Sequence, residues 1–114
     1  MTIELGYFTI GVADVTRARK FYGALFGWEF DAAASNEQYA HVSNTKLPFG
    51  LYKAAPADLS AFHFRVDDIE AFAAKVRTLG GVPGEITKSP SGLGSLCVDD
   101  QGTKFSLWQP ATGF

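Results

Sequence analysis

The sequence predicts an α+β protein built from two βαβββ modules, with module one at about residues 4–55 and module two at about residues 59–110. Three observations carry this prediction. The segment that begins at Phe8 is echoed at one constant spacing by the segment that begins at Phe62. Each copy opens with strand-like alternation and continues with apolar residues at helical spacing. A second echo, FGLYK against FSLWQ, closes each copy, which indicates a duplicated supersecondary unit.

The elements of the first module follow from local patterns. Residues 4–13 alternate between two faces, which predicts a strand. Asp14 follows at a position suited to a helix N-cap, and apolar residues at helical spacing continue to Phe26. Gly27 should end this helix in the left-handed conformation. Three further strands are predicted at residues 28–32, 38–43 and 49–53.

The second module repeats this order after a linker-like segment at residues 54–58. A strand is predicted at residues 61–67, and Asp68 should cap a helix that stops at Gly80. The remaining strands are predicted at residues 84–88, 94–99 and 104–109. The small residues of segment 88–94 suggest a loop, which is a candidate gate for a site.

Composition and charge narrow the class of partner. The net charge is −2 and no run of lysines or arginines occurs, which argues against nucleic acid and anionic membranes. No segment approaches the roughly 20 apolar residues of a membrane span. The N-terminal segment lacks a basic region and suggests a strand, not a signal peptide. Cys97 is the single cysteine, so no intrachain disulfide can form, and we expect a cytoplasmic protein.

The segments VADVTRARKFYGALFGW and DDQGTKFSLWQ resemble motifs of the vicinal oxygen chelate superfamily. This superfamily contains glyoxalase I, extradiol dioxygenases, fosfomycin-resistance enzymes and bleomycin-resistance proteins. Its members show V-x-D, a helix with F-Y, then L-G-W or a close variant, and a closing D-P-x-G-N-x-x-E-L. The resemblance covers essentially the whole chain. It implies one domain over residues 1–114, in which the modules form a half-open mixed β-barrel with outer helices, and it implies a homodimer.

The resemblance also implies four strand positions for metal ligands. Tyr7 lies five residues before the V of V-x-D, and Ala61 is its counterpart in module two. Ser106 lies four residues after Gly102 of the closing turn, and the FGLYK/FSLWQ echo gives Gly50 as its partner. Alanine and glycine carry no side-chain donor, and neutral serine and tyrosine are poor ligands for divalent ions. We therefore expect no metal cofactor.

Alternation predicts which strand residues face away from the helices, because one face of each antiparallel sheet is buried. Phe62, Phe64 and Val66 should cover the second helix, as should Phe105 and Leu107. The opposite face supplies the candidate ligand-binding residues, in which aromatic area, small gaps and polar groups combine as in a small-molecule pocket. They are Tyr7, Thr9, Gly50, Tyr52, Ala61, His63, Arg65, Lys104, Ser106 and Trp108.

Three of these residues have alternative roles. His63 is a candidate general acid or base, since its ordinary pKa lies near neutrality, or a hydrogen-bonded histidine of the sheet. Arg65 can hold a carboxylate or phosphate of a ligand with its planar guanidinium, or pair with an acidic side chain. Trp108 can stack on a ligand or pack in the core or at a dimer interface.

The leading hypothesis is a metal-free, glyoxalase/bleomycin-resistance-like protein that binds a small aromatic or amphipathic molecule in the cavity or the dimer cleft. Arg65 and Lys104 favour a neutral or anionic ligand. Three alternatives remain open. A metal-dependent lyase, isomerase or dioxygenase would use displaced ligands such as His63 or His41, and a metal-free enzyme would use His63 as acid or base. An interaction module would have its cavity filled by side chains such as Tyr7 and Trp108.

Overall fold

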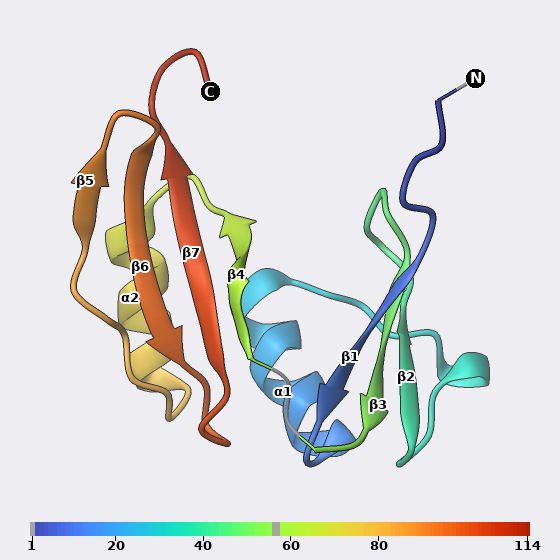
Figure 1. The fold of residues 1–114 in the computed structure, drawn as a ribbon. Helices are drawn as coiled ribbons and strands as arrows, with labels where there is room; N and C mark the ends of the chain where they lie inside the picture. The colour runs from blue at the N-terminus through green and yellow to red at the C-terminus, as the bar shows by residue number, and fades with distance from the viewer. Residues whose placement is uncertain (1, 56–57) are drawn as a thin grey trace. The chain divides into compact units, whose positions relative to one another are not determined.

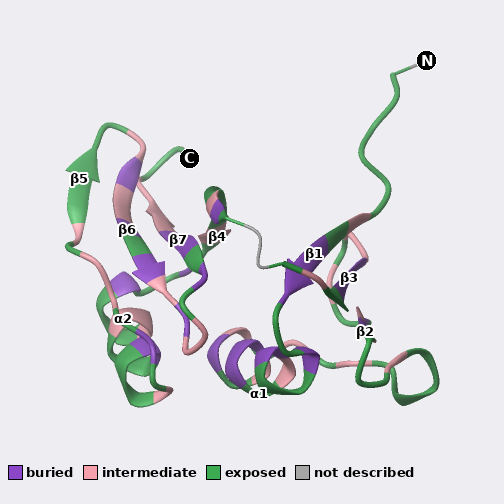
Figure 2. Cartoon of the chain, turned by 60° about the horizontal axis from the view of Figure 1, so that its bottom comes forward, coloured by how far each residue is buried: buried purple, intermediate pink, exposed green. Residues whose placement is uncertain are grey.

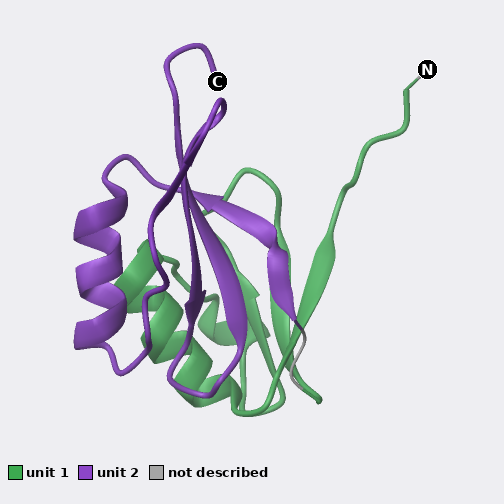
Figure 3. Ribbon diagram, turned by 60° about the vertical axis from the view of Figure 1, so that its left-hand side comes forward, with its two compact units in different colours: residues 1–57 green, residues 58–114 purple. Residues whose placement is uncertain are grey.

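The computed structural model describes residues 2–55 and 58–114. Met1 and two residues of the predicted linker, Pro56 and Ala57, lie outside the described residues. The chain divides into two compact units, Met1–Ala57 and Asp58–Phe114 (Figure 3). Each unit contains one mixed sheet and one main helix. The α+β prediction is therefore confirmed.

The first unit contains the elements β1 (Phe8–Val12), α1 (Val15–Phe26), the 3-10 helix η1 (Ala32–Ala34), β2 (Tyr39–Val42) and β3 (Phe49–Lys53) (Figure 1). The strand order is β1-β3-β2. β1 runs parallel to β3, and β2 runs antiparallel to it. β3 is thus the central strand, and β1 and β2 are the two edges.

The helix α1 has the bounds and the caps that the sequence predicts. The Asp14 carboxylate accepts a hydrogen bond from the Arg17 amide at 3.0 Å, which satisfies one of the free donors of the first turn. Gly27 ends the helix with a φ of 72°, a left-handed conformation that glycine adopts without a steric penalty. The buried stripe of α1 consists of Val15, Ala18, Phe21, Tyr22 and Leu25.

The prediction of a full strand at residues 28–32 is wrong. Only Phe30 pairs there, through an isolated bridge to Val42. The Asp31 carboxylate instead accepts a hydrogen bond from the Ala33 amide at 3.0 Å and caps η1. An aspartate that bonds its own backbone two residues on favours a turn over a ladder. The sheet of the first unit therefore has three strands.

The second unit contains β4 (Leu59–Arg65), α2 (Ile69–Thr78), β5 (Thr87–Ser89), β6 (Gly92–Val98) and β7 (Lys104–Pro110). The strand order is β4-β7-β6-β5, in which β4 and β7 are parallel and the other pairs are antiparallel. This unit therefore has the complete βαβββ order. The cap prediction for α2 is confirmed, since the Asp68 carboxylate accepts from the Ala71 amide at 3.1 Å.

The strand β4 departs from simple alternation. Its register with β7 shifts between Leu59 and His63. Leu59 is buried, whereas Phe62 is 42% exposed. The expectation that Phe62 covers the helix is wrong, because an irregularity of this kind reorients the side chains on the bulged strand. Val66, just after β4, is buried as predicted.

Residues 88–94, predicted as a loop, form the tip of a hairpin. Ser89 of β5 pairs with Gly92 of β6 across a two-residue turn, and Gly92 has a φ of 134°. The strand predicted at residues 84–88 begins later, at Thr87. The Gly84 carbonyl instead accepts a hydrogen bond from the Ser95 hydroxyl at 2.9 Å. The candidate gate is therefore a short β-turn.

Buried residues lie on the strands and along one stripe of each main helix (Figure 2). Phe105 and Leu107 of β7 are fully buried, as alternation predicts. Cys97 is a buried free thiol. In the parts of the chain that the structure describes, no helix is long and apolar enough to cross a membrane.

Candidate ligand-binding site

The open face of the first sheet carries tyrosines. Ile10 and Leu51 are buried against the core of the unit, whereas Thr9 and Tyr52 are exposed, as alternation predicts. The register places Thr9 directly beside Gly50 on the central strand. These neighbours belong to β1 and β3, so the two strands present one common face.

The gap expected at Gly50 is occupied. A Cβ atom at this position would overlap the phenol of Tyr39 on β2. Gly50 is accordingly buried although its neighbour Tyr52 is 43% exposed. The expectation that Gly50 leaves room for a ligand is wrong, because a side chain from the neighbouring strand fills the space above it.

Tyr39 belongs to a cluster with Tyr7 and His41. The Tyr7 hydroxyl makes one hydrogen bond with the Tyr39 hydroxyl and a second, of 3.1 Å, with Nδ1 of His41. The rings of Tyr7 and His41 lie nearly parallel, with centroids 6.0 Å apart and planes at 7°. We call these three residues the Tyr–His cluster. It joins two phenols and an imidazole on one side of the sheet.

The cluster holds Tyr7 in its neutral form. Desolvation, the hydrogen bond with Tyr39 and the nearby Tyr39 phenol together raise the pKa of Tyr7 from 10.0 to about 12. Tyr7 is 41% exposed, so its phenol is also reachable from solvent. It therefore acts as a neutral hydrogen-bonding group at any physiological pH.

The open face of the second sheet is lined by β4 and β7. The register pairs His63 with Ser106 and Arg65 with Trp108. The Ser106 hydroxyl donates a hydrogen bond of 2.6 Å to the main-chain oxygen of Ser60, so it is already engaged within the sheet. The other two members of the predicted set, Ala61 and Lys104, are exposed.

Trp108 is fixed by contacts on two sides. Its indole Nε1 donates to the Ser91 carbonyl at 3.1 Å, from the tip of the β5–β6 hairpin. The Arg65 guanidinium lies 5.6 Å from the centroid of the Trp108 ring, within the range of a cation–π contact. One guanidinium nitrogen of Arg65 also donates to the Phe114 main-chain oxygen at 3.3 Å. The ring and the cation are thus held together before any ligand is present.

Two hollows flank this pair in the second unit. One, of about 430 Å³, is lined by His63, Ser91 and Trp108. The other, of about 650 Å³, lies between Arg65, Phe72 and the tail at residues 110–114. Both volumes fall in the range of small-molecule sites. The Trp108 indole thus lines the hollow that contains His63, and Arg65, which contacts this indole, lines the other hollow.

The four positions that the resemblance implies for metal ligands do not fit a divalent ion here. Gly50 and Ala61 have no donor atom, the Tyr7 phenol is bonded within the cluster, and the Ser106 hydroxyl donates to the main chain. Within residues 2–55 and 58–114, no group of three or more histidine, cysteine, aspartate or glutamate side chains could hold a metal ion.

The fold is similar to that of a solved structure described as a glyoxalase/bleomycin resistance protein/dioxygenase family enzyme, as the sequence resemblance implies. Residues 5–44 match the family model of the bleomycin resistance protein-like N-terminal domain. A comparison with curated proteins found no match.

Several solved structures have a fold similar to that of this chain. A glyoxalase/bleomycin resistance protein/dioxygenase family enzyme from Burkholderia phytofirmans PsJN has a TM-score of 0.78 at 13% identity, covering 96% of this chain and 100% of that chain. TnmS3, an antibiotic binding protein from Streptomyces sp. CB03234, has a TM-score of 0.74 at 21% identity, covering 96% and 98%. The fosfomycin resistance protein FosX from Mesorhizobium loti has a TM-score of 0.74 at 19% identity, covering 98% and 96%.

Sequence reasoning gave Tyr39 no role and named His41 only as a candidate displaced metal ligand, so it did not predict the Tyr–His cluster. Tyr39 and His41 alternate with the buried residues Ala40 and Val42 along β2, so a period-two signal was present. A pattern along one strand does not give the strand order. In the structure, β2 lies next to β3, and His41 lies opposite Gly50. Without that order, nothing indicated that these side chains would meet Tyr7.

Proposed function

We propose that the protein binds a small aromatic molecule, neutral or anionic, without a metal. The observation that carries this proposal is the pair of Arg65 and Trp108 beside the hollow lined by His63 and Ser91. A flat indole offers stacking area at little entropic cost, and a guanidinium is suited to a carboxylate. The antibiotic binding protein among the structural neighbours supports small-molecule binding as a use of this fold.

His63 lines the same hollow and is the residue on which metal-free acid–base chemistry would depend. The binding proposal does not require it to transfer a proton.

We also propose a cytoplasmic homodimer. The buried free thiol of Cys97 suits a reducing compartment. The dimer is checked by light scattering.

Titration with benzoate, followed by tryptophan fluorescence, tests the binding proposal. The chain has two tryptophans, and Trp28 contacts Phe49 edge-on within the first unit. We expect Trp28→Phe to keep the fluorescence change and Trp108→Phe to lose it.

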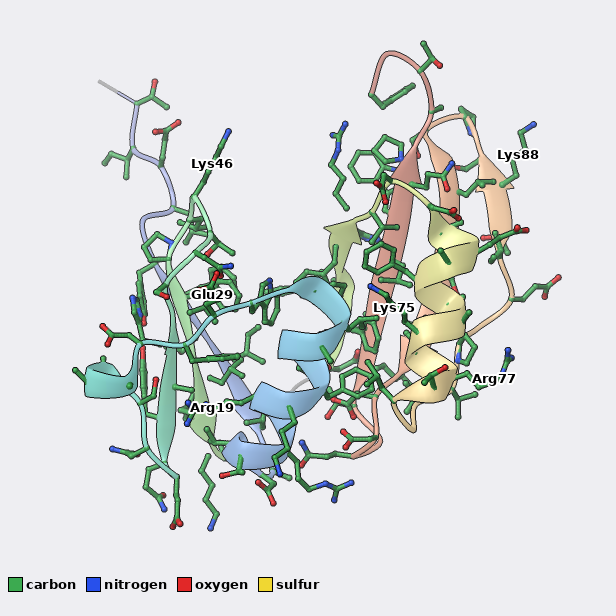
Figure 4. The ribbon with its side chains drawn as sticks, turned by 180° about the vertical axis from the view of Figure 1, so that it is seen from behind. Arg19, Glu29, Lys46, Lys75, Arg77 and Lys88 are labelled. Carbon is green, nitrogen blue, oxygen red and sulfur yellow. The ribbon has the colours of Figure 1, made fainter. Side chains whose placement is uncertain are left out.

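A variant of Arg65 tests whether its charge binds the ligand, and a variant of Arg77 serves as the matched control. Arg65→Gln should weaken benzoate binding by about tenfold or more, since hydrogen bonds to charged groups contribute about 1.5–3 kcal/mol. Arg77→Gln removes a cation from the last turn of α2 (Figure 4) and should leave the affinity unchanged. Benzylamine should bind more weakly than benzoate. Equal benzoate affinity in the wild type and Arg65→Gln, or a fluorescence change that survives Trp108→Phe, would overturn the proposal.

A further inference from the structure

The Tyr–His cluster spans the first sheet from one edge to the other. Tyr7 immediately precedes β1, and Tyr39 and His41 lie on β2, with β3 between these strands. Neighbouring strands are about 4.8 Å apart, so the two edges are separated by about 10 Å. Side chains from both edges can meet above the central strand only where it carries no side chain. Gly50 provides that place, since its missing Cβ leaves the space for the Tyr39 phenol.

The hydrogen bonds of the cluster leave one donor for a ligand. Two hydroxyls and one neutral imidazole carry three protons in all. The two internal hydrogen bonds, between Tyr7 and Tyr39 and between Tyr7 and His41, use two of these protons. Whichever imidazole nitrogen is protonated, one donor and several oxygen or nitrogen lone pairs therefore remain outside the internal bonds. A partner that both donates and accepts satisfies this arrangement best, and a hydroxyl group does so.

The surroundings of the cluster are aromatic and accessible. Tyr7 is 41% exposed and Tyr52, opposite Tyr39 in the register, is 43% exposed. The stacked rings of Tyr7 and His41 add a flat surface. The raised pKa of Tyr7, about 12, keeps the cluster free of phenolate. A neutral ring can therefore approach without meeting a negative charge on Tyr7.

From these observations we infer that Tyr7, Tyr39 and His41 form a recognition site for a neutral aromatic hydroxyl group, that is, for a phenol. The inference rests on the proposed function in assuming that the chain binds a small molecule. It uses only residues of the first unit, whereas Arg65 and Trp108 belong to the second.

The probe for this site is para-nitrophenol, whose phenolate absorbs visible light and whose neutral form does not. Binding at the cluster should favour the neutral phenol, so the wild-type protein should raise the apparent pKa of the probe. The methyl ether para-nitroanisole has the same ring but no hydroxyl proton. It should bind at least about threefold more weakly, since it forfeits one hydrogen bond.

Variants then assign the effect to the cluster. Tyr39→Phe removes one hydroxyl and should weaken para-nitrophenol binding by roughly threefold to tenfold. Gly50→Ala should weaken it as well, because the new methyl group displaces the Tyr39 phenol. Ser43→Ala deletes a hydroxyl that instead bonds the Glu29 carbonyl and should leave binding unchanged. Melting curves identify any variant that has lost its fold.

Each outcome separates this inference from the proposed function. The inference is wrong if para-nitrophenol fails to bind or if the protein lowers the apparent pKa of the probe. It is also wrong if Tyr39→Phe binds para-nitrophenol as tightly as the wild type does. Benzoate titration of Trp108 then decides the proposed function independently. Conversely, a Tyr39-dependent response to para-nitrophenol without any benzoate response supports the first-unit site and rejects the Arg65–Trp108 site.

Discussion

The Tyr7 hydroxyl contacts two partners, and this contact has a consequence for alkaline stability. Its pKa in the folded protein, about 12, exceeds the ordinary value of 10.0. The folded state therefore favours the neutral phenol. The resulting stabilisation is fully present below about pH 10 and is lost as the pH rises from 10 through 12.

Urea unfolding at about pH 9 and about pH 11 measures this loss. The wild-type protein should lose more of its unfolding free energy over this interval than Tyr7→Phe, which cannot ionise at that position. Tyr52→Phe keeps the Tyr7 contacts and should follow the wild type. A Tyr7→Phe variant with the full alkaline loss would show that another group causes it.

Individual side chains were predictable where they depend on one strand alone. The burial of Phe105 and Leu107 and the exposure of Thr9 follow from alternation. Contacts that join different strands were not predictable. The meeting of Tyr7 with Tyr39 depends on the order β1-β3-β2, and a single sequence does not state which strands are neighbours.

The elements differ in how well local sequence specifies them. Both main helices begin and end close to the predicted residues, because a cap, an apolar stripe and a glycine stop all agree. The strands are less well specified. Residues 28–32 have a strand-like composition, but the Asp31 side chain caps a turn. The register shift in β4 belongs to its pairing with β7, which local composition does not encode.

The cap of α2 yields a prediction at the scale of the element. Asp68→Ala removes the acceptor for the Ala71 amide and should lower the unfolding free energy by about 1 kcal/mol, with a range of roughly 0.5–2 kcal/mol. Asp67→Ala removes the adjacent exposed carboxylate and serves as the matched control. Urea unfolding at neutral pH provides the measurement. A loss in Asp67→Ala equal to that in Asp68→Ala would contradict the capping role.

At the scale of the whole molecule, each unit has a strand, a helix and further strands in that order, although the first sheet has three strands and the second has four. The four positions implied for metal ligands are distributed evenly between the units. The resemblance and the duplication together indicated these positions in the sequence, and their side chains are poor donors for a divalent ion. The two units nevertheless use different chemistry. The first presents neutral phenols and an imidazole, and the second presents a guanidinium on an indole. The sequence repeat could not predict this difference, because a repeat shows only which residues the two halves have in common.

Metal addition tests the whole chain at once. We expect Zn²⁺, Ni²⁺, Mn²⁺ and Fe²⁺ to leave the melting temperature of the dialysed protein unchanged. If the chain had a metal site, free metal at about one hundred times the dissociation constant would add about 2.7 kcal/mol to the unfolding free energy. A melting curve detects a change of this size. A parallel sample in chelator controls for adventitious ions. Stoichiometric metal that survives dialysis would contradict the expectation.

The Tyr39 phenol occupies the space that a side chain at position 50 would need. This overlap restricts which substitutions the first sheet can accept. A carboxylate or imidazole at position 50 would occupy the space of the Tyr39 phenol. Any side chain introduced at position 50 therefore displaces the Tyr39 phenol and breaks the Tyr–His cluster. The hydrogen-bonded cluster and a metal-ligating side chain at position 50 are thus mutually exclusive in this sheet.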